Sequence, residues 1–181
     1  MSRFDNIINH TALAEGDYQA LKNDSGNYNS LKQLVGTNLG ISAKAYEAYL
    51  KRPPTVKDMM AITPAIRNQV YKTLFYVPLQ ADALKSDSVA HLAFDTFIAT
   101  GNVLLIKKAI GQLVGKSTSG LYNLTAADIK AINAINAKLF FDRLKLLNYQ
   151  QRRVAAAQYG ANKKKVLEAW NKRLDKIIFI G

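Results

Sequence analysis

The sequence has no cysteine, and it has only two histidines and four prolines. The lack of cysteine excludes disulfides, thiolate metal sites and cysteine nucleophiles. His10 and His91 lie far apart and have no partner at ligand spacing, so a histidine-based metal site is not expected. We therefore expect a protein that works without a cofactor.

Long apolar runs are also missing. No run approaches the roughly 18 residues that a membrane-spanning helix needs. Residues 1–6 lack a charged start followed by an apolar stretch, so no cleavable signal peptide is expected. A role outside the cytoplasm would then require another route of export.

Negative charge is scarce, with 13 acidic against 25 basic residues, a net charge of +12 and a pI near 9.8. Such a balance indicates a polyanionic partner: nucleic acid, an anionic cell envelope or an anionic membrane surface. Many basic residues fall late in the chain, where they form either a solvated face or a docking surface for an anionic polymer. They are Lys138, Arg143, Lys145, Arg152, Arg153, Lys163, Lys164, Lys165, Lys172, Arg173 and Lys176.

The apolar pattern predicts an all-α fold. From residue 42 onward, apolar residues recur at helical spacing, which favours a helical bundle around an N-terminal helix. Residues 17–41, rich in turn formers, predict a small irregular or β-hairpin lobe. The pattern from residue 125 to 149 predicts one long helix, and Gly101 is expected to end a helix over 89–100. Five N-caps are expected, at Ser42, Thr55, Thr63, Thr125 and Asn162.

The predicted first helix, residues 4–14, delivers a carboxylate at its end. Phe4, Ile8, Thr11 and Glu15 fall on one stripe of this helix. A carboxylate that continues an apolar stripe is unusual, because its burial costs free energy unless it is paired or protonated. Glu15 either points to solvent at the helix end or stands, with a raised pKa, at the mouth of a cleft.

Asp95 lies inside the apolar helix predicted over residues 89–100. Buried polar groups are nearly always hydrogen-bonded. We therefore expect a structural carboxylate that is hydrogen-bonded to a helix end.

Several short segments resemble glycoside hydrolase family 108, whose members are muramidases, many of them from phages and prophages. Residues 15–18, 23–27 and 36–42 resemble the N-terminal signature of the family, and residues 71–76 the helix that follows it. Residues 94–113 and 169–173 resemble a companion peptidoglycan-binding segment with a closing Gly-Trp-x-x-Arg element. The resemblance implies a lysozyme-like muramidase segment over 1–86 and a helical peptidoglycan-binding segment over 87–181, packed together as one compact unit.

The chain departs from the family pattern at three positions. Asp17 replaces a usual Gly, Asn27 replaces the second Gly of the loop, and Ala169 replaces the Gly of the closing element. The stretch from residue 28 to 35 is also longer than the common pattern. The departures leave Glu15 in place but affect the loop that carries the second catalytic group.

The order of three residues is also similar to that in phage lysozymes of the T-even type. Asp24 follows Glu15 by nine residues, and Thr37 precedes a Gly-Ile turn. The resemblance implies that Glu15 is the general acid and that Asp24 and Thr37 position the attacking water. The candidate sugar contacts are Tyr18, Asn23, Tyr28, Asn38 and Tyr46. The three tyrosines are equally able to serve as packing residues.

The implied activity is hydrolysis of the β-1,4 bond between N-acetylmuramic acid and N-acetylglucosamine. Carboxyls roughly 6.5–9.5 Å apart would indicate inversion, and about 5–5.5 Å retention. If Glu15 acts alone, the reaction is that of a lytic transglycosylase. Two further alternatives are a non-enzymatic basic protein that binds nucleic acid or wall polymer, and an inactive muramidase fold with a structural role.

The same resemblance implies the partners and the place of action. Peptidoglycan is the expected partner, and the basic surface is expected to bind the anionic cell envelope. Nucleic acid is not expected as a partner. The protein is expected to be a monomer. It is expected to be made in a host cytoplasm and to act on the cell wall after holin release, after injection or as a virion component.

Overall fold

The structure is a computed structural model that describes residues 2–12, 17–115 and 120–180. The chain divides into two compact units, Met1–Val77 and Pro78–Gly181, each of which is described by itself. Within the described ranges the regular structure is helical, and β-pairing is limited to three isolated bridges. The prediction of an all-α, lysozyme-like protein is thus confirmed. None of the helices in these ranges is long and apolar enough to cross a membrane.

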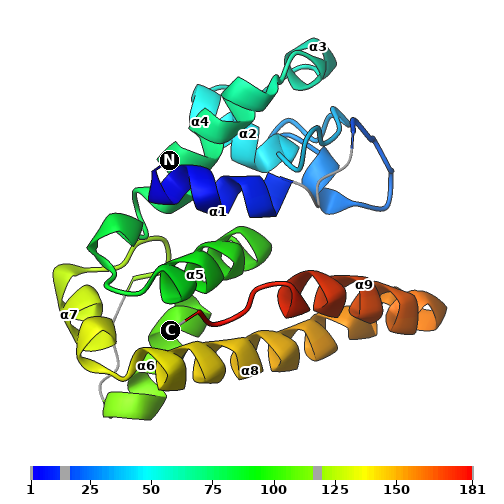
Figure 1. The fold of residues 1–181 in the computed structure, drawn as a ribbon. Helices are drawn as coiled ribbons and strands as arrows, with labels where there is room; N and C mark the ends of the chain where they lie inside the picture. The colour runs from blue at the N-terminus through cyan, green and yellow to red at the C-terminus, as the bar shows by residue number, and fades with distance from the viewer. Residues whose placement is uncertain (1, 13–16, 116–119, 181) are drawn as a thin grey trace. The chain divides into compact units, whose positions relative to one another are not determined.

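The helices of the first unit begin at the predicted caps. Ser42, Thr55 and Thr63 each accept a hydrogen bond from a backbone N–H of the first turn that follows them, and Thr55 forms a full capping box with Asp58. The elements of this unit (Figure 1) are α1 (Arg3–Ala12), the 3₁₀ turn η1 (Ser25–Asn27), α2 (Ala43–Leu50), α3 (Val56–Met60), α4 (Pro64–Tyr71) and the π-helical turn η2 (Lys72–Tyr76).

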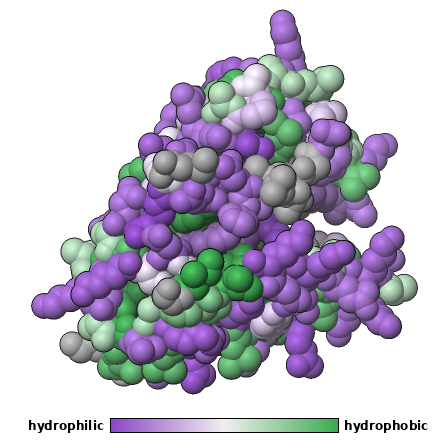
Figure 2. Space-filling view, viewed as in Figure 1, coloured by the Kyte–Doolittle hydropathy of each residue, from purple (hydrophilic) through white to green (hydrophobic). Residues whose placement is uncertain are grey.

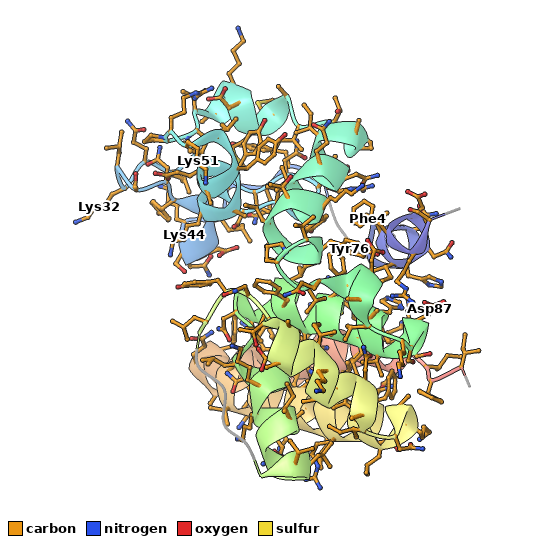
Figure 3. All side chains as sticks on the ribbon, turned by 90° about the vertical axis from the view of Figure 1, so that its left-hand side faces the viewer. Phe4, Lys32, Lys44, Lys51, Tyr76 and Asp87 are labelled. Atoms are coloured by element: carbon orange, nitrogen blue, oxygen red, sulfur yellow. The ribbon has the colours of Figure 1, made fainter. Side chains whose placement is uncertain are left out.

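The apolar stripe of α1 is buried. Phe4, Ile7 and Ile8 are at most 7% exposed, as the helical period predicts. The Phe4 ring meets the Tyr76 ring edge-on at a centroid distance of 5.0 Å (Figure 3). This contact attaches α1 to the end of the α4–η2 segment.

Residues 17–41 form an irregular lobe. Its chain is held by isolated antiparallel bridges at Gln19–Thr37, Tyr28–Leu34 and Asn38–Ile41 rather than by a continuous ladder. Val35 and Ile41 are buried and supply an apolar base. An irregular or a β-hairpin lobe was predicted here, and the structure shows the irregular one.

The second unit packs around α8, which contacts helices α5, α6, α7 and α9. Its fully buried side chains include Leu92, Phe94, Ile106, Phe140 and Leu144. The elements (Figure 1) are the 3₁₀ turn η3 (Ala81–Ala83), α5 (Asp87–Thr100), α6 (Leu104–Val114), α7 (Ala126–Ala134), α8 (Ala137–Ala156), the 3₁₀ segment η4 (Ala157–Asn162) and α9 (Lys163–Asp175).

The prediction of one helix from residue 125 to 149 was wrong. Ile135 is extended, with φ −81° and ψ 146°, and it separates α7 from α8. Asn136 then caps α8, because its Oδ1 accepts from the backbone N–H of Leu139 at 3.0 Å. The apolar period continues across the break, so periodicity alone could not reveal it.

The partner predicted for Asp95 was also wrong, although its burial is confirmed at 2% exposure. Its Oδ2 lies 3.2 Å from an Arg152 guanidinium nitrogen, and its Oδ1 accepts from Arg173 Nε at 2.9 Å. A carboxylate this deep requires a charged partner, and two arginines from α8 and α9 supply it. Arg152 and Arg173 are therefore not part of a solvated basic face.

Helix α9 differs from expectation at its start and in its burial. Asn162 occupies the N-cap position but makes no side-chain capping hydrogen bond. Of Val166, Trp170 and Leu174, all expected to be buried, only Leu174 is; the other two are partly exposed. Trp170 instead lines a cavity of the second unit.

Candidate active site

The irregular lobe contains a side-chain network centred on Asn27, which is fully buried. Asn27 Nδ2 donates to Gln19 Oε1 at 2.9 Å and to the Leu21 carbonyl at 3.0 Å. Asn27 Oδ1 accepts from Gln19 Nε2 at 3.0 Å and from Thr37 Oγ1 at 2.6 Å. These four bonds use the full hydrogen-bonding capacity of the amide, so its orientation is fixed.

Backbone hydrogen bonds also hold Gln19, Asn27 and Thr37 in register. Gln19 and Thr37 exchange both backbone hydrogen bonds, at 2.9 and 2.8 Å. The Asn27 carbonyl accepts from the N–H groups of Val35 and Gly36 at 2.9 and 3.0 Å. The position of the Thr37 hydroxyl is therefore determined by main chain and side chain together.

Asp24 joins this network from its exposed side. Its Oδ1 accepts from the Gly26 N–H at 2.9 Å and caps η1, while its Oδ2 accepts from Gln19 Nε2 at 3.4 Å. Gln19 thus lies between Asp24 and Asn27. The structure brings Asp24 and Thr37, two of the three predicted catalytic residues, into one hydrogen-bonded cluster.

This cluster presents two different oxygens. Asp24 offers an exposed carboxylate, and Thr37 offers a half-buried hydroxyl whose proton is directed to Asn27. Because that proton is engaged, the hydroxyl oxygen faces other groups as an acceptor. A carboxylate and an acceptor hydroxyl are suited to orienting a water molecule through its two hydrogens.

Glu15, the predicted general acid, belongs to residues 13–16 and lies outside the described residues. Its role stays a prediction, as does the separation between its carboxyl and that of Asp24. Within the described ranges there is no group of three or more His, Asp or Glu residues that could hold a metal ion.

Three of the predicted sugar contacts lie on or near the surface of the lobe. Tyr18 is half-buried, and its hydroxyl donates to the Val35 carbonyl at 3.2 Å. The Tyr28 hydroxyl donates to the Lys22 carbonyl at 2.9 Å. Asn23, which follows Lys22 in the chain, is exposed. Each of these side chains retains a surface that a ligand could reach.

The other two predicted contacts, Asn38 and Tyr46, are each only 7% exposed. Asn38 Nδ2 donates to the Met59 carbonyl at 2.9 Å and so ties the lobe to α3. The Tyr46 ring stacks on Tyr49 at 6.1 Å, and burial raises the pKa of its hydroxyl. Their burial favours a positioning role over direct contact with a ligand.

Neither Gln19 nor the role of Asn27 was predicted from the sequence. Asn27 was noted only as a substitution for Gly, although a side chain with two donors and two acceptor sites can organise a loop that lacks regular backbone pairing. The sequence does not reveal which of the several loop amides is buried. Only the three-dimensional structure identifies this pair.

Comparison with solved structures finds the same fold in a protein of Brucella abortus. The chain resembles the structure titled "Structure of Brucella abortus SagA" with a TM-score of 0.74, covering 96% of this chain and 90% of that one. The sequence identity is 20%, so the likeness concerns the fold alone. No curated protein matches the chain.

Comparison with protein families gives a match to Glycosyl hydrolase 108 over residues 8–101, slightly more than half of the chain. The matched range includes Glu15 and the whole cluster of Gln19, Asp24, Asn27 and Thr37. The chain therefore belongs to glycosyl hydrolase family 108 and is a glycoside hydrolase of the lysozyme type that acts on the bacterial cell wall.

Proposed function

We propose that the protein is an N-acetylmuramidase that hydrolyses the β-1,4 bond between N-acetylmuramic acid and N-acetylglucosamine in peptidoglycan. The observation that carries the proposal is the link from Asp24 through Gln19 and Asn27 to Thr37. An exposed carboxylate and an acceptor hydroxyl in one rigid cluster supply what a hydrolytic water needs.

In the proposed mechanism the water donates one hydrogen bond to Asp24 and one to Thr37. Its oxygen attacks the anomeric carbon as the glycosidic bond breaks, and Asp24 takes the proton that the water loses. Glu15 gives its proton to the leaving oxygen as general acid. Asn27 acts through Thr37, because it fixes the direction in which that hydroxyl accepts.

For the sugar-binding surface we propose direct contacts from Tyr18, Asn23 and Tyr28, with Asn38 and Tyr46 supporting the lobe. Tyrosine rings suit this role because an apolar face can pack on a sugar ring while the hydroxyl stays hydrogen-bonded. The hydroxyls of Tyr18 and Tyr28 are both bonded to backbone carbonyls, which fixes the rings in place.

The basic surface is proposed to hold the enzyme on the anionic cell envelope rather than on nucleic acid. Lys32, Lys44 and Lys51 are exposed and lie on the same side of the first unit (Figure 3). In the second unit, polar residues cover much of the visible face of α9 (Figure 2), whose exposed residues include Lys163, Lys164, Lys165 and Lys172.

Residues 87–181 are proposed to bind peptidoglycan, and the protein is proposed to be a monomer. The place of action is the periplasm or cell wall, reached by holin release, by injection or in a virion, as in an endolysin of phage or prophage origin.

Mass spectrometry of digested sacculi tests the reaction. The expected products are muropeptides with reducing N-acetylmuramic acid ends. Anhydro ends would show instead a lytic transglycosylase that uses Glu15 alone. A failure to release muropeptides, together with salt-sensitive binding to DNA, would favour a non-enzymatic basic protein and overturn the proposal.

A further inference from the structure

The second unit contains a cavity of about 470 Å³, and none of the residues of the candidate active site lines it. Its volume falls within the range of roughly 300–1,000 Å³ that is typical of ligand pockets. The walls come from α5, α6, α8 and α9, with α8 and α9 in contact along one side (Figure 1). The lining residues are Ala99, Thr100, Asn102, Leu104, Leu105, Asn148, Gln151, Arg152, Ala155, Trp170 and Arg173.

The lining includes two arginines and no acidic residue. Asp95, which is buried and does not line the cavity, binds Arg152 at 3.2 Å and Arg173 at 2.9 Å. Arg152 also donates to the Trp170 carbonyl. These contacts hold both guanidinium groups in fixed places, so the cavity has a preorganised cationic wall that suits a carboxylate.

The rest of the wall combines small apolar groups with amides. Leu104, Leu105 and Ala155 supply apolar surface against which a ligand methyl group can pack. The Asn148 amide nitrogen is engaged by Thr96 Oγ1 at 2.8 Å and by the Leu144 carbonyl at 2.9 Å. Asn148 is 1% exposed, so the amide that a ligand N–H can reach is that of Gln151, which is exposed.

We propose that this cavity binds the peptide stem of peptidoglycan, with a stem carboxylate against the arginine wall and alanine methyl groups against the leucines. The glycan strand carries no free carboxylate for the arginine wall, because the lactyl group of N-acetylmuramic acid is joined to the stem as an amide. A short peptide instead presents carboxylates, amide N–H groups and methyl groups, which match the three kinds of lining. The inference builds on the proposed function, because peptidoglycan supplies both the glycan that is cleaved and the stem.

The experiment uses the full chain and its single tryptophan, Trp170, which lines the cavity. The probe is a disaccharide–tetrapeptide muropeptide with N-acetylmuramic acid at its reducing end, which lacks the bond cut by a muramidase. Its titration is followed by tryptophan fluorescence and by isothermal calorimetry. The expected result is saturable binding that changes the Trp170 emission.

Two substitutions on α8 form a matched pair. Gln151→Glu places a negative charge in the lining, whereas Gln150→Glu places the same charge on the neighbouring exposed residue outside it. Like charges repel, and a carboxylate at position 151 would share the cavity lining with the carboxylate of the ligand. The expected result is at least about a tenfold loss of muropeptide affinity for Gln151→Glu and a change below about twofold for Gln150→Glu.

Chemically altered probes separate the possible sources of binding. A muropeptide with its stem carboxylates amidated, and the disaccharide without a peptide, should each bind at least about tenfold more weakly. If the disaccharide bound as tightly as the muropeptide, the cavity would be a sugar site. If the amidated muropeptide did so, the stem carboxylates would not contribute to binding. Either result overturns the inference. So would the absence of calorimetric binding by the wild type.

Cleavage is measured separately on sacculi. A protein that releases muropeptides but fails to bind the probe overturns only this inference. A protein that binds the probe but leaves sacculi intact overturns only the muramidase reaction.

Discussion

Thr37 Oγ1 donates a 2.6 Å hydrogen bond to Oδ1 of Asn27, a residue with no exposed surface. The bond joins two positions ten residues apart and fixes the direction in which the hydroxyl can accept. In the proposed mechanism the attacking water lies in this direction from Thr37 Oγ1 and donates a hydrogen bond to it.

The first prediction concerns that hydroxyl. Thr37→Val keeps the shape of the side chain but removes the acceptor, so kcat on sacculi should fall about 100-fold with a small change in KM. Thr37→Ser retains the hydroxyl and should keep kcat within about fivefold. Initial rates and thermal unfolding midpoints are measured for both variants, and a valine variant with wild-type kcat would remove Thr37 from the mechanism.

The second prediction concerns Gly36, which has φ +88°. A Cβ atom there would lie 2.6 Å from Tyr18 Cε2 and 2.7 Å from the Gln19 carbonyl oxygen. Gly36→Ala should therefore lower the free energy of unfolding by more than about 2 kcal/mol. Gly115, at φ +70° with nothing within 4 Å of its Cβ position, gives a matched control.

Gly115→Ala bears only the strain of the left-handed backbone, about 1 kcal/mol. Urea unfolding of the two variants measures the difference between them. Equal losses would show that the close approach of Tyr18 and Gln19 to Gly36 does not constrain the lobe.

The third prediction concerns the ion pairs of Asp95. Asp95→Ala removes the carboxylate from two arginines, and one of them, Arg152, is only 8% exposed. Leaving a buried cation without its partner should lower the free energy of unfolding by about 3–5 kcal/mol. The control is Asp142→Ala, whose pair with Lys138 is more than half exposed.

Exposed pairs contribute little, so Asp142→Ala should change the free energy of unfolding by less than about 1 kcal/mol. Both variants are compared with the wild type by urea unfolding. A similar small effect at Asp95 would contradict the structural role given to it.

The fourth prediction concerns pH. Asp58 accepts two hydrogen bonds from Arg52, both at 2.8 Å, and one from the Thr55 N–H. The Arg52 bonds, followed by those from Thr55, hold the pKa of Asp58 well below its usual range. A lowered pKa means that the folded state favours the charged form, so the stabilisation exists above the ordinary carboxyl pKa and is lost as pH falls.

The stability gap between wild type and Asp58→Asn should accordingly be constant from pH 7 to 5 and shrink below about pH 4. Urea midpoints at each pH measure the gap. A gap that does not change down to pH 2 would show that the charge of Asp58 does not contribute.

The features predictable from the sequence were those set by neighbouring residues. The caps at Ser42, Thr55 and Thr125 depend on a side chain three residues from its backbone partner, and all three have the expected bonds. Gly101 ends α5 with φ +69°, as a left-handed residue should. In each case the cause and its effect lie within one turn of helix.

The features that were missed depend on distant residues or on a weak local signal. Asp95 pairs with arginines 57 and 78 residues away, so no local pattern could name them. Gln19 and Asn27 meet across a loop, where the sequence shows only several interchangeable amides. At Asn136 a capping residue was present, but the continuous apolar period around it predicted an unbroken helix.

In the proposed mechanism Glu15 protonates the leaving oxygen. The most direct test compares Glu15→Gln with Glu168→Gln, the same change at an exposed position of α9, by the clearing of outer-membrane-stripped cells. We expect Glu15→Gln to keep the wild-type unfolding midpoint but to lyse cells at least about 1,000-fold more slowly, while Glu168→Gln lyses them like the wild type. Lysis at the wild-type rate by Glu15→Gln would show that Glu15 is not the general acid.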